Sequence, residues 1–453
     1  MVYQHYHFVG IGGIGMGALA SLLLDQGRQV SGSDLAENYV IKQLKEKGAR
    51  IFIGHNRQNI KGTDVVIFSS AIDTKNSELA EAKKDRIPIF PRAELLADLM
   101  KGHIGVTIAG AHGKTTTTSM VSHLLMKAGL EPTIAIGGIV QGTGSHACLG
   151  KGNYFVAEVD ESDGSFLKFS PVYSIITNMD FEHVDYYHNW ENILKAYREF
   201  MAKTAEDGCI FACGEDERLL KLLKESKKKF RTYGLSSKFD VSASNIQLSE
   251  GSAFDCVIDG QKQGTVSLII PGEHNVLNAL ACVSLGFELS IDFKTIRDSL
   301  KEFQGVKRRL QLKGEIDGIK VMDDYAHHPT EIEMTLKAAQ FLKKNRLIVV
   351  FQPHRFTRIK FLEKEFAQSL KFCDHLIVTD IYAASEKPIA GIDAQRLVEQ
   401  IKKISSVPVL YLKKPEIVSH VLETARPGDL VLTMGAGDIT YIADDLLHAY
   451  VAK

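Results

Sequence analysis

Short apolar runs alternate with stretches of helical period along almost the whole chain. The first such repeat is a predicted strand, HFVGI, followed by a glycine-rich turn, a helix that runs through Leu24, and a second strand, RQVSGSD, that ends at Asp34. Strands that alternate with helices in this way are typical of βα units, which build parallel sheets. The hydrophobic pattern therefore predicts an α/β fold.

Two interruptions of this pattern, near residues 100 and 310, divide the chain. Because 453 residues are too many for one hydrophobic core, we expect domain boundaries at these places. We predict three α/β domains over residues 1–100, 101–310 and 311–453, with Rossmann-like domains on either side of a central phosphate-loop ATPase domain. The central domain is expected to hold a parallel sheet, with a small antiparallel sheet at its edge between about 239 and 270.

The amino-acid composition limits the kinds of molecule that the protein is expected to bind. The chain has 54 Lys and Arg against 55 Asp and Glu and no long basic run, which argues against a nucleic-acid groove or an anionic membrane surface. Its six cysteines include no C-x-x-C, and no apolar run approaches the length of a membrane span. We expect a soluble cytoplasmic protein with small-molecule partners; the sequence does not indicate an oligomeric state.

The most specific motif is TIAGAHGKTTTT, at residues 107–118, which continues a predicted strand and opens a helix. Gly110 and Gly113 allow a tight turn whose backbone N–H groups can point at phosphate oxygens. Lys114 supplies an ammonium group for the outer phosphates, and the Thr115 hydroxyl suits Mg²⁺. Although the loop is two residues shorter than the usual G-x-x-x-x-G-K-[ST], the order of strand, loop and helix favours a nucleotide site over a structural turn.

Carboxylates gather at the end of the next predicted strand, NYFVAEVDESD, where Glu158, Asp160, Glu161 and Asp163 are candidate ligands of Mg²⁺. Alternate residues of a strand share a face, so Glu158 and Asp160 are expected to point together toward the nucleotide. A further segment, DFEHVDYYH, could suggest zinc. Because oxygen ligands and a phosphate loop favour Mg²⁺ over zinc, one of its histidines could be a ligand of a second magnesium or a phosphate contact. The residues alone leave a packing role for this histidine as an equal alternative.

The N-terminal glycines form a second phosphate-binding motif. Gly10, Gly12 and Gly15, with Asp34 at the end of the following strand, match the dinucleotide-binding fingerprint. A uridine diphosphate sugar offers the same pyrophosphate as NAD, and an NAD-dependent oxidoreductase would leave the ATP site unexplained. A non-catalytic, ATP-gated binding protein is the other alternative. Two phosphate sites in one chain favour an ATP-driven reaction on a nucleotide-linked substrate.

Two polar motifs, DDYAHHP at 323–329 and QPHRFTR at 352–358, follow predicted strands of the third domain. Arg355 and Arg358 could clamp a carboxylate, and Tyr325 with His327 could position an amine or its carboxylate. A surface salt-bridge network is the alternative interpretation.

Across nearly its full length the chain resembles the Mur ligases of bacterial cell-wall synthesis. The resemblance is carried by GIGGIGMGALA, SSAI, AGAHGKTTTT, EVDESDGSF, TNMDFEHVD, GEHNVLNALA, GVKRRLQ, DDYAHHPTE, FQPHRFTR and MGAGDI. It implies an ATP-dependent ligase that joins L-alanine to the lactyl carboxylate of UDP-N-acetylmuramic acid through an acyl phosphate, with release of ADP and phosphate. Members that attach a tripeptide to the same sugar nucleotide in cell-wall recycling are the alternative, since their D-D-x-A-H-H-P is similar; Tyr325 and the intact FQPHRFTR favour alanine.

The resemblance also implies roles for single residues, with ATP and two Mg²⁺ ions bound during the reaction. The expected ATP contacts are Gly110, His112, Gly113, Lys114, Thr115, Thr116, Asn275, Asn278, Arg309, Asp323 and Asp324. Among them the two asparagines are expected to flank the adenine, and one of the two aspartates to lie near the ribose. The expected contacts of the UDP-sugar are Gly12, Gly13, Ile14, Ser69, Ser70 and Asn178, and those of alanine are Tyr325, His327, Arg355 and Arg358. Thr115 and Glu158 are expected to hold the first Mg²⁺ and His183 the second. Lys114, His183 and His327 are the expected catalytic residues, with His327 a candidate base for the amine.

Overall fold

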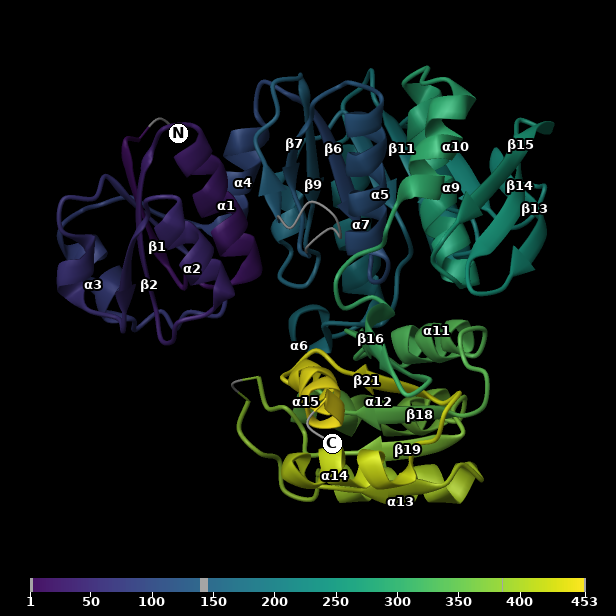
Figure 1. Cartoon of the computed structure of the whole chain (residues 1–453). Coiled ribbons are helices and arrows are strands. Elements are labelled where there is room, and N and C mark those ends of the chain that lie inside the picture. Colours follow the sequence, from purple (N-terminus) through teal and green to yellow (C-terminus); the bar gives the residue numbers. More distant parts are fainter. Residues whose placement is uncertain (1–2, 139–145, 385, 452–453) are drawn as a thin grey trace. The chain divides into compact units, whose positions relative to one another are not determined.

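The computed structural model describes residues 3–138, 146–384 and 386–451 (Figure 1). By its internal contacts the chain forms two compact units. The first holds Met1–Asn245, Phe254–Val266 and Leu277–Gln304, and the second holds Ile246–Ala253, Ser267–Val276 and Gly305–Lys453. The sheets of the described residues, each with its helices, confirm the predicted α/β class, whereas the boundaries near residues 100 and 310 stay predictions.

The N-terminal sheet has five parallel strands in the order β3-β2-β1-β4-β5. Its strands are β1 (His5–Val9), β2 (Gln29–Asp34), β3 (Arg50–Ile53), β4 (Val65–Phe68) and β5 (Ile89–Pro91). Its helices are α1 (Ile14–Asp25), α2 (Tyr39–Glu46), α3 (Ser77–Lys84) and α4 (Arg92–Met100), with a 3-10 turn over Arg57–Ile60. This is the Rossmann-like order that the sequence predicts. The strand order reverses between β1 and β4, the place where doubly wound sheets bind ligands.

The central sheet follows the order β15-β14-β13-β12-β11-β10-β6-β9-β7-β8. Parallel pairing joins β7 (Thr133–Ala135), β9 (Tyr154–Glu158), β6 (Ile104–Ala109), β10 (Tyr173–Ile176), β11 (Cys209–Cys213) and β12 (Phe230–Gly234). β8 (Ala147–Cys148) pairs antiparallel with β7. β12 also pairs in parallel with β13 (Val241–Leu248), and β14 (Ser252–Ile258) and β15 (Gln261–Leu268) follow it. The edge segment predicted between about 239 and 270 therefore continues the central sheet.

Several helices connect or follow the strands of the central sheet in the sequence. The first of them, α5, begins directly after the phosphate loop. They are α5 (Lys114–Lys127), η2 (Ser165–Lys168, a 3-10 helix), α6 (Val184–Tyr187), α7 (Trp190–Ala202), α8 (Glu217–Glu225), α9 (Glu273–Glu288) and α10 (Phe293–Glu302). The first turns of α5 bury hydroxyl groups, which bond within the helix: Thr118 Oγ1 donates to Lys114 O at 2.8 Å and Ser119 Oγ donates to Thr115 O at 2.7 Å. These back-bonds satisfy donors that burial removes from water, so a polar helix start can pack against β6 and β9.

The C-terminal sheet has the order β16-β17-β21-β18-β19-β20. Its strands are β16 (Gln311–Ile316), β17 (Ile319–Asp324), β18 (Leu347–Phe351), β19 (His375–Val378), β20 (Val409–Tyr411) and β21 (Leu430–Met434). Only the β16–β17 pair is antiparallel among the described pairings of this sheet. Its helices are α11 (Pro329–Ala339), α12 (Phe356–Ser369), α13 (Ala394–Ile404), α14 (Lys414–Thr424) and α15 (Thr440–Val451). MGAGDI, at residues 434–439, begins with the last residue of β21 and forms the turn into α15.

The central parallel strands are continuous apolar runs. β11, β18 and β21 are buried at every position. A strand that is covered on both faces can be apolar at every position, instead of alternating apolar and polar residues. The polar side chains that could bind ligands therefore lie beyond the carboxyl ends of these strands. None of the helices within the described residues has the length and apolar character needed to cross a membrane.

Candidate active site

The phosphate loop needs its two glycines. Gly110 has φ of +129° and Gly113, the residue before α5, has φ of +81°, which is the region that L side chains rarely adopt. A Cβ on Gly110 would lie 2.1 Å from Thr177 Oγ1, and one on Gly113 would lie 2.6 Å from Asn278 Oδ1. Both glycines of the short phosphate loop therefore lie against other parts of the chain, Gly110 against Thr177 and Gly113 against Asn278.

Asn178, which follows β10, holds the loop in place. Its Oδ1 accepts the His112 backbone N–H at 2.9 Å, and its Nδ2 donates to the His112 carbonyl at 3.1 Å. The Ala111 N–H donates to the Asn178 carbonyl at 3.2 Å. These bonds show that the Asn178 side chain supports the phosphate loop, whereas its contact with the UDP-sugar stays a prediction.

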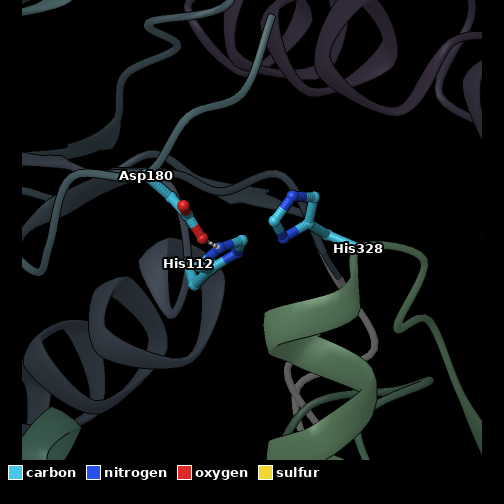
Figure 2. Close-up of side chains that lie close together, drawn as sticks. All are labelled: His112, Asp180 and His328. Carbon is cyan, nitrogen blue, oxygen red and sulfur yellow. Dashed lines mark hydrogen bonds and ion pairs between the residues drawn. The ribbon is translucent and has the colours of Figure 1, made fainter. Parts of the chain in front are cut away.

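The side chain of His112 is fixed as well. Its Nε2 lies 2.9 Å from Asp180 Oδ2, and Figure 2 shows the imidazole facing this carboxylate. The other carboxylate oxygen of Asp180 accepts the backbone N–H of Phe181 at 2.7 Å. His112 thus joins the phosphate loop to the segment after β10 through its side chain as well as its backbone.

Lys114 is buried among carboxylates. Its Nζ donates to Glu161 Oε1 at 2.9 Å and to the carbonyls of Gly110 and Ala111. Burial opposes the charge of Lys114, but the carboxylates of Glu161, Asp160 and Glu158 outweigh it and raise the pKa of Lys114 above its ordinary value. The ammonium group therefore stays charged at the mouth of the loop, as phosphate binding requires.

Thr115 and Glu158, the predicted ligands of the first Mg²⁺, lie together. Thr115 Oγ1 donates to Glu158 Oε1 at 3.0 Å, and Gly137 N–H donates to Glu158 Oε2 at 2.9 Å. A hydroxyl and a carboxylate are hard oxygen ligands of the kind Mg²⁺ prefers. The donor set fits the ion.

His183 belongs to a second group of possible ligands. One ligand atom from each of Glu161, Glu182 and His183 lies within 4.8 Å of the other two. His183 Nε2 is 3.6 Å from Glu161 Oε1 and 3.6 Å from Glu182 Oε2. Burial works against the protonated ring, yet these carboxylates raise the pKa of His183 above its ordinary value. Two carboxylates suit Mg²⁺ better than zinc, and a second magnesium at this place stays a prediction.

The two asparagines predicted to flank adenine differ in their surroundings. Asn278 Oδ1 accepts Thr117 Oγ1 at 3.1 Å, beside the phosphate loop in the first unit. Asn275 belongs to the second unit, where its Nδ2 donates to the Pro271 carbonyl at 2.7 Å. The side chain of Thr116 is buried in the first turn of α5.

The N-terminal fingerprint lies at the carboxyl edge between β1 and β4. Gly12 N–H donates to Asp34 Oδ2 at 2.8 Å, and Asn38 Nδ2 donates to the Gly12 carbonyl at 2.9 Å. A Cβ on Gly12 would meet both side chains within 2.9 Å. Asp34, which an NAD site would use for a ribose hydroxyl, is therefore employed in ordering the loop.

Of the other residues predicted for the sugar nucleotide, Gly13 precedes α1 and Ile14 begins it with an exposed side chain. Ser69 follows β4, where its N–H donates to the Val9 carbonyl at 3.3 Å, and Ser70 is exposed beside it. The structure thus brings these residues to the same edge as the glycines.

Asp323 and Asp324, predicted near the ATP ribose, are both buried and hydrogen-bonded within the second unit. Asp323 accepts from Arg308 Nε at 3.1 Å, and from Thr433 and Thr440 at 2.8 Å. Asp324 accepts the N–H groups of Leu310 and Ala326, each at 2.7 Å, and burial raises its pKa to about 6. These bonds support the adjoining loops, and contact of either carboxylate with ATP stays a prediction.

The residues that are predicted to bind the substrate L-alanine follow the carboxyl ends of β17 and β18. The rings of Tyr325 and His327 meet edge to face at 5.2 Å, and His327 meets His354 in the same way at 5.5 Å. Arg358 Nη1 lies 3.0 Å from His354 Nδ1. Arg355 has φ of +69° at the start of α12, and its N–H donates to the Tyr382 carbonyl at 2.9 Å.

Arg309 adds a third arginine to this group, beside Arg355 and Arg358. Its guanidinium lies 5.4 Å from the centre of the Tyr325 ring, and its Nη1 lies 3.9 Å from Glu331 Oε1. The group therefore combines three guanidinium groups with an imidazole and a carboxylate, and its binding of alanine stays a prediction.

Several residues of these sites were not singled out from the sequence. Glu161 was one of four candidate carboxylates, and no pattern selected it as the partner of Lys114. Glu331 could have been found, because it follows His327 by four residues at a helix start. His354 and Tyr382, whose rings stack at 5.7 Å, come from separate strand ends and had no local signal.

Comparison with known proteins agrees with this arrangement. Three family models match the chain: the catalytic domain of the Mur ligase family at residues 5–104, the Mur ligase middle domain at 108–286, and the Mur ligase, glutamate ligase domain, at 308–437. A UDP-N-acetylmuramate–L-alanine ligase of Pelotomaculum thermopropionicum is 47% identical over 439 residues, which cover 96% of this chain and 95% of the relative. The enzyme of the same name from Geobacter sulfurreducens is 47% identical over 440 residues, with the same coverage.

Solved structures extend the similarity to the fold. The UDP-N-acetylmuramate-alanine ligase of Thermotoga maritima has a TM-score of 0.86 and 31% identity, and the match covers 99% of both chains. A murein peptide ligase of Psychrobacter arcticus has a TM-score of 0.75 and 25% identity, over 99% of this chain and 98% of the other. On these matches, together with the phosphate loop and its carboxylates, the chain belongs to the Mur ligase family.

Proposed function

We propose that this protein is an ATP-dependent ligase that joins L-alanine to the lactyl carboxylate of UDP-N-acetylmuramic acid, forming an amide with release of ADP and phosphate. This reaction is a step in the synthesis of peptidoglycan precursors, and its small, water-soluble substrates favour a cytoplasmic enzyme. The observation that carries the proposal is the phosphate loop, where Lys114 is held against Glu161 and Thr115 against Glu158.

The choice of alanine over a tripeptide rests on the relatives. Full-length relatives named for L-alanine are 47% identical to this chain, whereas the murein peptide ligase of known structure is 25% identical. The cluster of Tyr325, His327, Arg355 and Arg358 supplies charges for both ends of a small amino acid. Attachment of a tripeptide is the less favoured reaction.

The reaction follows from the placement of charge. Lys114 and the N–H groups of the loop would bind the ATP phosphates and stabilise charge that develops as the lactyl carboxylate attacks the γ-phosphorus. Mg²⁺ bound by Thr115 and Glu158, with a second ion at Glu161, Glu182 and His183, would supply further positive charge to the phosphates. The product of this step is an acyl phosphate. Arg355 and Arg358 would hold the alanine carboxylate, so that its amine can attack the acyl carbon.

The test is phosphate release from ATP with UDP-N-acetylmuramic acid and one of three acceptor conditions: L-alanine, L-Ala-γ-D-Glu-meso-diaminopimelate, or none. The expected result is release that depends on L-alanine and is abolished by Lys114→Ala. Lys127→Ala is the matched control, since Lys127 ends the same helix and pairs with exposed Glu302. Release only with the tripeptide would move the protein to the recycling activity, and no release with any acceptor would refute a ligase.

A further inference from the structure

The imidazole of His327 meets two acceptors at one nitrogen. Nδ1 lies 3.0 Å from the Tyr325 carbonyl oxygen and 3.2 Å from Glu331 Oε2. Neither oxygen can donate a hydrogen bond when Glu331 is ionised, so the neutral ring carries its proton on Nδ1. In the part of the chain that the structure describes, the hydrogen bonds of this ring all use Nδ1. Nε2 is then the nitrogen with a lone pair for a substrate.

Glu331 is itself held firmly. It lies in the first turn of α11, and its Oε2 also accepts the backbone N–H of His327 at 3.1 Å. Its other oxygen faces Arg309 Nη1 at 3.9 Å. The side chains of His327 and Glu331 are 18% and 12% exposed, so the carboxylate is largely shielded from water while the ring keeps an open edge. This geometry fixes both the tautomer and the orientation of the ring.

The neighbouring ring of His354 does not compete with His327 for a proton. The titratable side chains facing it are Tyr325, Glu331 and His354. Burial, together with the charges of His327, Arg358 and Arg355, lowers the pKa of His354 to about 3. His354 is therefore neutral at physiological pH, and its Nδ1 is already engaged by Arg358.

We propose that Glu331 is a positioning residue that acts through His327, whose Nε2 takes a proton from the ammonium group of the incoming alanine. The inference rests on the proposed ligase function and deepens it. His327 becomes an imidazolium stabilised by the Glu331 carboxylate, in the manner of aspartate–histidine pairs in hydrolases. The neutral amine forms the C–N bond to the acyl carbon. The C–O bond to the phosphate breaks with its electron pair on the leaving phosphate, which also takes the second amine proton.

Two acceptors of different basicity test this role in the complete enzyme. The variant is Glu331→Gln, whose amide oxygen still accepts the His327 N–H. The matched control is Glu333→Gln on the same helix, where Glu333 forms an exposed pair with Lys337. L-alanine is protonated at neutral pH and needs a base, whereas hydroxylamine is mostly unprotonated and does not. We expect the kcat with L-alanine to fall at least about tenfold in Glu331→Gln, since general bases contribute about 10²–10⁴. ADP formation with hydroxylamine should stay within about twofold of wild type.

The outcomes of this experiment distinguish failure of the inferred role of Glu331 from failure of the proposed ligase function. Equal loss with both acceptors would assign Glu331 a merely structural role and overturn the inference, as would full alanine activity in Glu331→Gln. Absence of ADP formation by the wild-type enzyme with either acceptor would overturn the proposed function and the inference together. A direct check is the ¹⁵N spectrum of His327 in the wild-type protein, where a proton on Nδ1 is expected and a proton on Nε2 in the neutral ring would refute the arrangement.

Discussion

A methyl group on Gly113 tests whether the phosphate loop is held in one backbone conformation. Gly113 has φ of +81°, and the new Cβ of Gly113→Ala would lie 2.6 Å from Asn278 Oδ1. Gly129, just beyond the other end of α5, has φ of +72° with no atom within 4 Å of its added Cβ. Both substitutions therefore place an alanine at a positive φ, which costs a similar free energy. Only Gly113→Ala also brings the new methyl group into a steric clash.

The magnitudes follow from these two contributions. A left-handed conformation costs an L residue about 1–2 kcal/mol, which is the whole expected effect of Gly129→Ala. In Gly113→Ala the Asn278 amide must also move, and its 3.1 Å hydrogen bond with Thr117 is worth about 0.5–1.5 kcal/mol. We therefore expect about 1.5–3.5 kcal/mol for Gly113→Ala. Because the loop N–H groups shift with the backbone, ATP affinity should fall about tenfold or more, which corresponds to about 1.4 kcal/mol.

The single tryptophan of the chain, Trp190, begins α7 and stacks on Phe181 of the central region. Urea unfolding followed by its fluorescence reports the unit that contains α5, and titration with ATP reports the loop. Equal unfolding free energies and equal ATP dissociation constants for the two variants would show that the contact with Asn278 does not constrain the loop, and would refute the reasoning.

Three further substitutions test separate parts of the site and fold. Thr115→Val removes the hydroxyl that bonds Glu158, so phosphate release should need a higher Mg²⁺ concentration, as a magnesium titration would measure; an unchanged midpoint would exclude Thr115 as a ligand. Asn178→Ala should raise the KM for ATP several-fold and leave that for the sugar nucleotide unchanged in steady-state kinetics, whereas the reverse would support the sugar contact. Burial disfavours ionised Glu78, but the nearby imidazole of His7, 3.7 Å away, and the hydrogen bonds from Ser33 and Asn59 lower its pKa from 4.5 to about 2. Its stabilisation is thus complete above pH 4.5 and is lost as the pH falls toward 2; Glu78→Gln should unfold more easily at pH 7 with a shallower loss on acidification, and an unchanged pH profile would refute this.

The fold was largely predictable because burial sets the period of apolar residues. Runs such as LIVVF, at residues 347–351, are apolar at every position, and the structure buries this run as β18 within a parallel sheet. The same logic brought the motifs together, since the carboxyl ends of parallel strands meet at one edge. A strand was missed where the apolar pattern was weak. β16 lies in a segment that the sequence analysis described only as a domain boundary.

Atom-level pairing could not be predicted, because it depends on where elements end and how distant segments pack. The alternation argument placed Glu158 and Asp160 on one strand face, but β9 ends at Glu158, and Glu161 beyond it becomes the partner of Lys114. Asn178 meets His112 across 66 residues of sequence. No local pattern distinguishes such an amide from one that binds a ligand.

Formation of an acyl phosphate is the central claim, and oxygen transfer tests it most directly. UDP-N-acetylmuramic acid labelled with ¹⁸O in its lactyl carboxylate would be converted with ATP and L-alanine, and the phosphate analysed by mass spectrometry. Attack of the carboxylate on the γ-phosphorus predicts one carboxylate-derived oxygen in each phosphate released. Amide formation with unlabelled phosphate would contradict the account, because the carboxylate would then have been activated without ever bonding to phosphorus.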